Sequence, residues 1–483
     1  MRSFMFLFSL SSPVKEEKSL YFTGQLYGVT SLRLALILCL TLSGFTQPIA
    51  IAKQTNKLPE LISLQNAIKM AQERDETLLK SRQTEQRFEA LSQGAKALPD
   101  PSISFGVLNL PSDSFNINQE PITQLKVGGS QQLPRGNTRE LNAKKYKAIA
   151  SEQPYLREDR LRVVALQTTH IWLDAYLATA SYRLVEETRP LFSKLGDIVS
   201  ASYAASAGNA KQQDIIRAEL ELMRLQDRLV QLKTRERTAL ADLIKYLIPA
   251  EAYYTDTPDI THLMLPNELP EIEKSDLEFV RSLKQSSIES IYPRISHHPL
   301  LATMDKRISS ASLDIELAQQ GYKPQYSLNA SYAYRADDPA GLRRADLFSV
   351  GLSVSVPLFS SGKIDADVQN SRLRTESIRT EKRLLAKELI AKLYQASESY
   401  YGAYERAEIY KKQILPQMAQ QADAAINAYT NDTGDFAEVV RAKIAELDAK
   451  ITLLNIEVNK RRALAKMHYF LPKKGSRKES TNE

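Results

Sequence analysis

Two stretches in the second half of the chain alternate apolar and small polar residues almost without exception. In residues 325–334, apolar residues including Tyr332 hold the even positions, and polar residues including Ser327 and Asn329 hold the odd ones. In residues 347–356 the apolar set is Phe348, Val350, Leu352, Val354 and Val356, and the set between them is Ser349, Gly351, Ser353 and Ser355. A period of two places one set on each face of a strand. Each stretch therefore predicts a strand of about ten residues, the length that a tilted strand needs to cross a bilayer.

Weaker alternation in the first half predicts strands near 102–110 and 122–133, so the chain has two hairpins, 102–133 and 325–357. The remaining patterns are helical, over 64–97, 137–205, 211–247, 300–320, 365–430 and 435–470. At about 1.5 Å per residue, the two longest would each measure on the order of 100 Å, too long for a globular core. We expect coiled-coil packing, because apolar residues in 385–414 recur mostly at steps of three and four. Pro190 and Pro416 are expected to bend or interrupt their helices.

The sequence has the pattern of an internal duplication. Four pairs of residues lie 226 apart: Gly136 and Gly362, Pro190 and Pro416, Tyr203 and Tyr429, Gly208 and Gly434. Together with the composition of the segments outside the two copies, the duplication divides the chain into five predicted segments. These are a signal peptide over 1–52, a first repeat over 53–248 with a tip near 206–210, a connector over 249–295, a second repeat over 296–470 with a tip near 430–435, and a disordered tail over 471–483.

The N-terminal segment has the pattern of a secretory signal peptide. An apolar run over 34–42 follows Arg33 and precedes Ala50-Ile51-Ala52, which predicts cleavage before Lys53. The only cysteine, Cys39, lies inside this run. A lipidated cysteine normally follows a small residue, whereas Cys39 follows Leu38. We therefore expect the mature chain to lack disulfides and thiol chemistry. No later window offers the eighteen or so apolar residues of a transmembrane helix.

Charge and motifs exclude several classes of function. Removing residues 1–52 takes away four Lys or Arg and two Glu, so the net charge falls from +7 to +5, spread over mixed-sign helices. This predicts a solvated surface and no nucleic-acid partner. There is no phosphate loop, nucleophile elbow or metalloprotease motif, so we expect neither an enzyme nor a cofactor. His297 and His298 precede Pro299 and are expected at a helix start or on the surface, not in a metal site, and Trp172 is expected in the core.

Four strands are too few to close into a barrel. An open sheet edge in lipid leaves backbone N–H and C=O groups without hydrogen bonds, and each such group costs several kcal/mol of free energy. Either the strands lie outside a membrane, or several chains share one barrel. Shared closure is favoured because it avoids exposing the apolar face to water. The predicted lipid-facing residues are Phe348, Val350, Leu352, Val354 and Tyr332. The predicted lumen-facing residues are Ser327, Asn329, Ser349, Gly351, Ser353 and Ser355.

These features resemble the TolC-like outer-membrane efflux family, the outer membrane factors. The resemblance is carried by 348–357 with Gly362, by 414–416, by Tyr429 with Gly434, by 438–442 and by their first-copy counterparts. Residues 98–105 are most similar to members of the heavy-metal, cobalt–zinc–cadmium subgroup. The resemblance implies a homotrimer with a shared twelve-stranded β-barrel, four strands per chain, continued by an α-helical coiled-coil barrel in the periplasm.

The resemblance also implies a function and partners. The protein would be the passive outer-membrane channel of a tripartite efflux system, in contact with outer-membrane lipid. A periplasmic adaptor would connect it to an inner-membrane pump, with the RND type favoured. Two alternatives stay open from the sequence: the outlet of a type I protein secretion system, and a periplasmic coiled-coil structural protein that forms no channel.

By position in the family, the turns at Gly208 and Gly434, with Tyr203 and Tyr429, would form an adaptor-docking tip. Acids just past the turns would line the pore constriction, with Glu438 the best candidate and Asp214 its first-copy partner. A ring of carboxylates at a narrow mouth favours cations. The chain departs from the family at Arg441, where some relatives carry a second acid. The alternative is that Asp214 with Arg217, and Glu438 with Arg441, are ordinary surface pairs three residues apart on a helix.

Overall fold

The computed structural model describes residues 61–204, 211–248, 263–273, 288–431 and 433–471. The predicted signal peptide, the residue Gly208, and most of the predicted connector and tail lie outside the described residues. The elements of the first half are α1 (Leu64–Glu73), α2 (Glu76–Gly94), β1 (Ser102–Leu108), β2 (Gln124–Leu133), α3 (Thr138–Ala150), α4 (Gln153–Ala204) and α5 (Gln212–Leu247). Those of the second half are α8 (Ile288–Ile295), α9 (Pro299–Gln319), the 3₁₀ turn η2 (Gln320–Tyr322), β3 (Gln325–Tyr334), β4 (Leu347–Ser355), α10 (Ser361–Ile409), the π-helix η3 (Tyr410–Ile414), α11 (Leu415–Thr430) and α12 (Phe436–Phe470).

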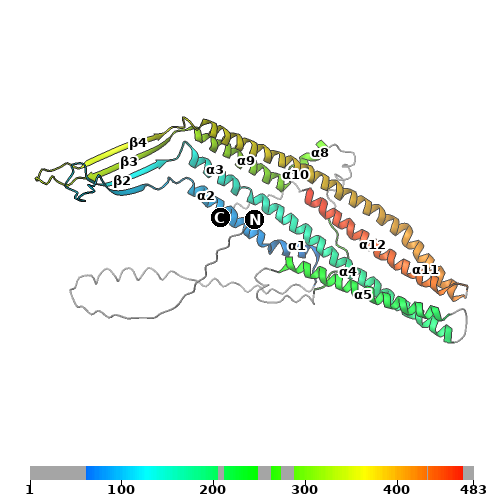
Figure 1. Cartoon of the computed structure of the whole chain (residues 1–483). Coiled ribbons are helices and arrows are strands. Elements are labelled where there is room, and N and C mark those ends of the chain that lie inside the picture. Colours follow the sequence, from blue (N-terminus) through cyan, green and yellow to red (C-terminus); the bar gives the residue numbers. More distant parts are fainter. Residues whose placement is uncertain (1–60, 205–210, 249–262, 274–287, 432, 472–483) are drawn as a thin grey trace, which may run out of the picture. The chain divides into compact units, whose positions relative to one another are not determined.

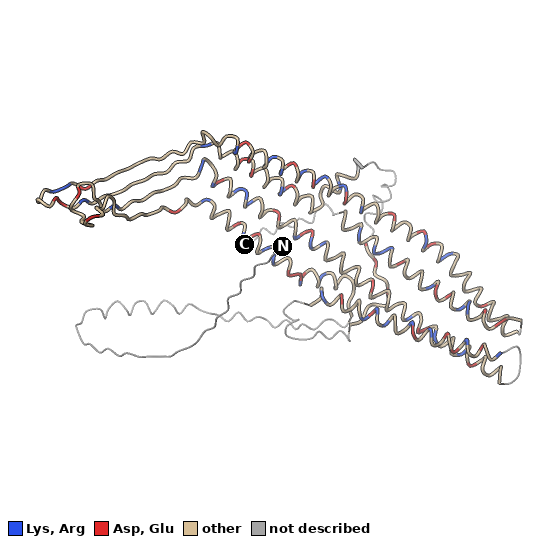
Figure 2. The backbone as a smooth tube through the Cα atoms, viewed as in Figure 1, with Lys and Arg blue, Asp and Glu red and all other residues tan. Residues whose placement is uncertain are grey.

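The four strands form one antiparallel sheet in the order β1-β2-β3-β4. In Figure 1 the sheet lies at one end of the helices, and the ends where α4 meets α5 and α11 meets α12 lie at the other. Figure 2 shows acidic and basic residues interspersed along the helices and in the loops beyond the sheet. The four described strands contain a single charged residue, Lys126. The sheet is therefore the neutral part of a chain whose helices are highly charged.

Two of the predicted helical stretches, 64–97 and 137–205, each consist of two helices, α1 with α2 and α3 with α4. The first break is at Asp75, whose carboxylate caps α2 by accepting a hydrogen bond from the Thr77 N–H at 2.9 Å and also binds Arg160. The second break precedes α4, where Glu152 binds Arg307 of α9 at 3.1 Å. In both places a carboxylate at the break is held by an arginine from a distant part of the chain.

The two prolines behave differently. Pro190 lies inside α4 and does not interrupt it, so a bend at this proline stays a prediction. Pro416 lies two residues after the end of the π-helix η3, so the hydrogen-bond ladder of this long helix is irregular there. Lys411 of η3 binds Glu457 of α12 at 2.6 Å. A π turn that shifts the ladder just before a proline accommodates the missing N–H without ending the helix.

The predicted seam of α10 is buried. Leu389, Leu393, Ala396, Tyr400 and Ala407 are all less than a tenth exposed, and they pack with residues of α12. A second core joins α1, α4, α5 and the segment 263–265. At its centre Trp172 is fully buried, stacks on Tyr176, and donates its indole N–H to the Ile62 carbonyl at 3.0 Å. The predicted core role of Trp172 is confirmed. None of the helices in the described part of the chain has an apolar stretch long enough to cross a membrane.

Candidate functional site

The strand register brings the apolar residues of the sheet onto one face. Tyr332 lies opposite Phe348, and Leu328 opposite Leu352. Along β3 the apolar residues are exposed while the polar residues between them are partly buried. Phe348 is 73% and Leu352 62% exposed. A sheet folded for water would do the opposite, so this face is built to meet an apolar surrounding. The predicted lipid-facing residues thus share one face, and their contact with lipid stays a prediction.

The other face of the sheet carries small polar residues. Ser327 lies opposite Ser353, and Asn329 opposite Gly351. The Asn329 amide donates to the Ser353 hydroxyl at 3.1 Å. Ser349 and Ser355 share this face by their alternation in β4. Side chains of this kind can line a wet surface, as the lumen-facing prediction requires.

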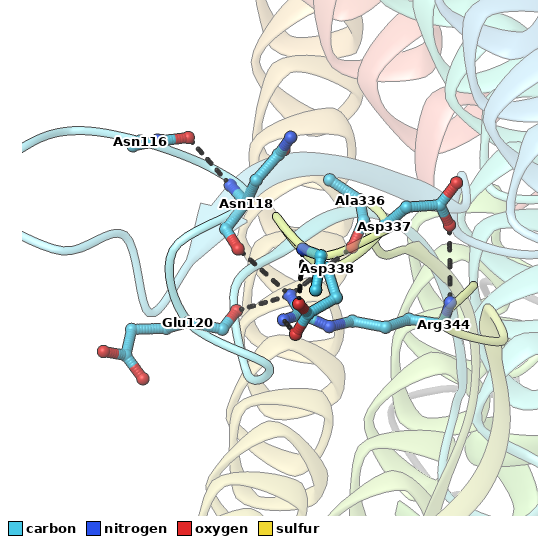
Figure 3. A network of polar contacts seen from close by, with 8 residues as sticks. Asn116, Asn118, Glu120, Ala336, Asp337, Asp338 and Arg344 are labelled. Atoms are coloured by element: carbon cyan, nitrogen blue, oxygen red, sulfur yellow. Dashed lines mark hydrogen bonds and ion pairs between the residues drawn. The ribbon is translucent and has the colours of Figure 1, made fainter. Parts of the chain in front are cut away.

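Arg344 connects the β1–β2 loop with the β3–β4 loop, at the end of the sheet away from the helices (Figure 3). Its guanidinium donates to the carbonyls of Asn118 and Glu120 in the β1–β2 loop, each at 3.3 Å, and pairs with Asp338 in its own loop at 2.7 Å. The side chain is only 11% exposed. One arginine thus holds two loops that are more than two hundred residues apart in sequence. Sequence reasoning missed it, because an arginine in a polar loop carries no local signal of a partner elsewhere.

The second-copy tip is a closely packed turn between α11 and α12. The N–H groups of Thr433 and Gly434 both donate to the Ala428 carbonyl, at 2.9 and 3.0 Å. A Cβ on Gly434 would lie 2.9 Å from the backbone of Ala428 and from the Tyr429 nitrogen. The Tyr429 ring packs against the buried Phe436, with ring centroids 5.5 Å apart. Gly434 therefore permits a close approach of backbone to backbone.

The two tip tyrosines differ in setting. Tyr203 lies in the last described turn of α4 and is 47% exposed. Tyr429 is partly buried against Phe436. The predicted docking role of both tyrosines, and of Gly208 and Gly434, stays a prediction, and the structure makes Tyr203 the more accessible side chain.

The candidate gate acids also differ. Asp214 is 3% exposed, and its carboxylate accepts a hydrogen bond from the Lys211 backbone N–H at 3.0 Å, so it caps its own helix. Arg217 is exposed on the same helix. Glu438 is in the first turn of α12 and pairs with Arg441, with 45% and 71% of the two side chains exposed. Of the two acids, Glu438 is the one whose charge can reach a solvent-filled opening.

Residues 292–468, which contain β3, β4, the Glu438–Arg441 pair and the second-copy tip, match the model of the outer membrane efflux protein family. This part of the chain is similar to that family. The predicted resemblance to the TolC-like family is confirmed. No curated protein sequence matches the chain.

Solved structures extend the likeness to both copies. The outer-membrane channel OprN has a TM-score of 0.67 at 15% identity, covering 84% of this chain and 89% of its own. VceC of Vibrio cholerae has a TM-score of 0.64 at 13% identity, covering 84% and 95%. The CmeC channel of Campylobacter jejuni has a TM-score of 0.66 at 12% identity, covering 84% and 85%. The chain therefore has the TolC-like fold predicted for it. The family name and these titles place such proteins in the outer membrane, the location that we predicted.

Two neighbouring histidines, His297 and His298, lie near the start of the matched range, just before α9. His298 is fully buried and caps α9, where its Nδ1 accepts from the Leu300 N–H at 3.3 Å. His297 is exposed, and its Nδ1 lies 2.8 Å from the Pro293 carbonyl. The expectation of a helix start for this pair is confirmed. Within the described ranges, no three His, Cys, Asp or Glu side chains group in a way that could hold a metal ion.

Proposed function

We propose that this chain is the outer-membrane channel of a tripartite efflux system, passively conducting substrates that an inner-membrane pump exports through a periplasmic adaptor. The observation that carries the proposal is the four-stranded sheet, whose apolar face is exposed and whose other face is small and polar. Such a sheet can separate lipid from a wet lumen. The fold of the efflux channels, found over most of the chain, supports the same function.

The channel requires more than one chain. β1 and β4 each have one unpaired edge among the described strands, and unpaired backbone groups in lipid cost several kcal/mol each. A homotrimer would close twelve strands into one barrel. The long helices, neutral on their packed side and charged outside, would continue the tube into the periplasm.

At the opposite end, the helix tips would meet the adaptor, with Tyr203 exposed for contact and Gly434 shaping the turn. Glu438 would face the constriction and Arg441 would partly neutralise it. Asp214, buried as a helix cap, would position the first-copy tip and contribute charge only when the tip opens.

The gate is tested by single-channel recording in planar bilayers. Replacing Glu438 and Asp214 together by alanine should raise conductance or leak, and Glu438→Ala alone should lower cation preference. Glu446→Ala provides a matched control, because this acid lies two turns further along α12 and pairs with Lys443 and Lys450. Conductance and selectivity that stay at the parent values in the double variant would show that these acids do not form the constriction.

The function is tested by deleting the gene and measuring susceptibility to metal ions, dyes and antibiotics, with the intact gene restored as a control. We expect sensitivity to at least one class of small toxic solute. Unchanged sensitivity to all of them, together with loss of a secreted polypeptide, would favour the type I secretion outlet. Unchanged sensitivity with no ion conductance would favour a structural coiled-coil protein.

A further inference from the structure

The two outer strands of the sheet carry the information needed to predict how neighbouring chains join. We propose that β4 of one chain pairs with β1 of the next copy, in the register of the chain's own β2–β3 junction. This inference rests on the proposed function and adds the residues of the seam. At the β2–β3 junction the end of the first hairpin meets the start of the second, so the seam would repeat the same join between molecules.

The strand positions give the register. β1 and β3 begin at Ser102 and Gln325, which are 223 residues apart, and β2 and β4 begin at Gln124 and Leu347, also 223 apart. Adding 223 to a β2 residue gives its counterpart in β4, and subtracting 223 from a β3 residue gives its counterpart in β1. Each β2–β3 pair within one chain therefore corresponds to a pair between β4 and the β1 of another copy. The observed pairs are Gln131 with Leu328, Gln132 with Ser327 and Leu133 with Tyr326. They become Val354 with Phe105, Ser355 with Ser104 and Val356 with Ile103 of the next copy.

This register is chemically consistent. Val354 is 45% and Phe105 78% exposed in the single chain, and both belong to the apolar face. Phe105 already lies opposite Val127, and Val354 opposite Tyr326, so the new pair gives each side chain an apolar neighbour on its free side and joins the apolar faces of the two sheets. Ser104 and Ser355 likewise bring the polar faces together. A slip of one residue would place apolar residues against the polar face along the whole seam.

The geometry of closure gives a second check. One row of paired residues runs Ser102, Ser130, Asn329, Gly351 across the chain. In the proposed register Gly351 lies opposite Leu108 of the next copy, so the row climbs six residues, from 102 to 108, over four strands. At about 3.3 Å per residue and about 4.8 Å between strands, this stagger tilts the strands by about 45°, as membrane barrels require.

The hairpins themselves differ by two residues in register, since Ser102 pairs with Ser130 whereas Gln325 pairs with Ser355, not with Ser353. A seam slipped by two residues is therefore the competing geometry. A slip in one direction would raise the tilt to about 54°, above the usual range of barrels, and a slip in the other would lower it to about 35°. The second of these pairs Ser353 with Ser104, and a direct measurement separates it from the proposed pair.

Disulfide cross-linking tests the seam. Ser104→Cys and Ser355→Cys are nearly isosteric and would be introduced together into a Cys39→Ala background, which removes the only natural cysteine. Within one chain β1 and β4 are three strand spacings, about 14 Å, apart, beyond the roughly 7 Å that a disulfide allows between Cα atoms. Oxidation of membranes holding the full chain can therefore link only different copies. We expect covalent dimers and trimers on a non-reducing gel, and only monomers from each single variant.

The matched control is Ser104→Cys with Ser353→Cys, which differs only in register. Stronger linking in this control than in the proposed pair would overturn the register. If neither pair links while native mass measurement of the same sample gives three copies, the seam is wrong and the proposed trimeric channel stands. If the sample contains single chains only, both the seam and the proposed channel fail.

Discussion

The turn at Gly434 allows a sharp prediction about the second-copy tip. In the variant Gly434→Ala, the new Cβ would lie 2.9 Å from the carbonyl carbon and Cβ of Ala428 and from the Tyr429 nitrogen. Two of these three atoms belong to the backbone of α11 and cannot swing away as a long side chain could. The turn must therefore open by about half an ångström, which weakens the two hydrogen bonds to the Ala428 carbonyl. Overpacking of this kind costs roughly 1–3 kcal/mol.

The matched control is Gly402→Ala, because a Cβ at Gly402 of α10 meets no atom within 4 Å. A glycine in a helix interior is about 0.5–1 kcal/mol less favourable than alanine, so this control should be neutral or stabilising. The assay is amide hydrogen exchange measured on peptides covering 425–445. A local loss of 1–3 kcal/mol predicts exchange roughly 5–150 times faster in Gly434→Ala. Exchange at the parent rate in this variant would refute the close-packed turn.

Three further predictions concern other parts of the chain. Trp172→Phe should leave the Ile62 carbonyl unsatisfied and lower the stability of the helical part by about 1–3 kcal/mol, measured by thermal unfolding in detergent, and an unchanged melting temperature would contradict the buried hydrogen bond. Burial opposes ionisation of Glu457, but hydrogen bonds from three neighbouring cations outweigh it and lower its pKa from an ordinary 4.5 to about 2. This carboxylate therefore stabilises the fold above pH 4.5 and ceases to do so as the pH falls towards 2, so Glu457→Gln should lower stability at neutral pH and flatten the pH dependence of unfolding between these values. Arg344→Ala should make the β1–β2 and β3–β4 loops more sensitive to protease added outside cells. Arg343→Ala removes the same charge at the neighbouring position and should leave this sensitivity unchanged. Equal sensitivity of the two variants would mean that Arg344 does not hold the two loops together.

The sheet and the helical packing were predictable because their determinants are local. Alternation over β3 and β4 identifies two faces without any knowledge of the partner strands. The spacing of three and four in α10 identifies Leu393 and Ala407 as buried, as they are. These patterns repeat over many residues, so a single exception does not obscure them.

The features that sequence reasoning missed depend on residues that meet only in the folded chain. Asp75 ends one helix and caps the next while Arg160 binds it from α4. Arg344 finds its acceptors in the other hairpin. The burial of Asp214 follows from packing of the tip, and its position just past a turn is equally typical of an exposed gate acid and of a helix cap.

The central claim is that the four strands of one chain cannot close a β-barrel in lipid, and that identical copies of the chain close it together. Native mass spectrometry of the protein, extracted by detergent from the outer-membrane fraction, tests this claim most directly. The proposed channel predicts a complex of three copies. A single-chain species recovered without detergent from the periplasmic extract would contradict it.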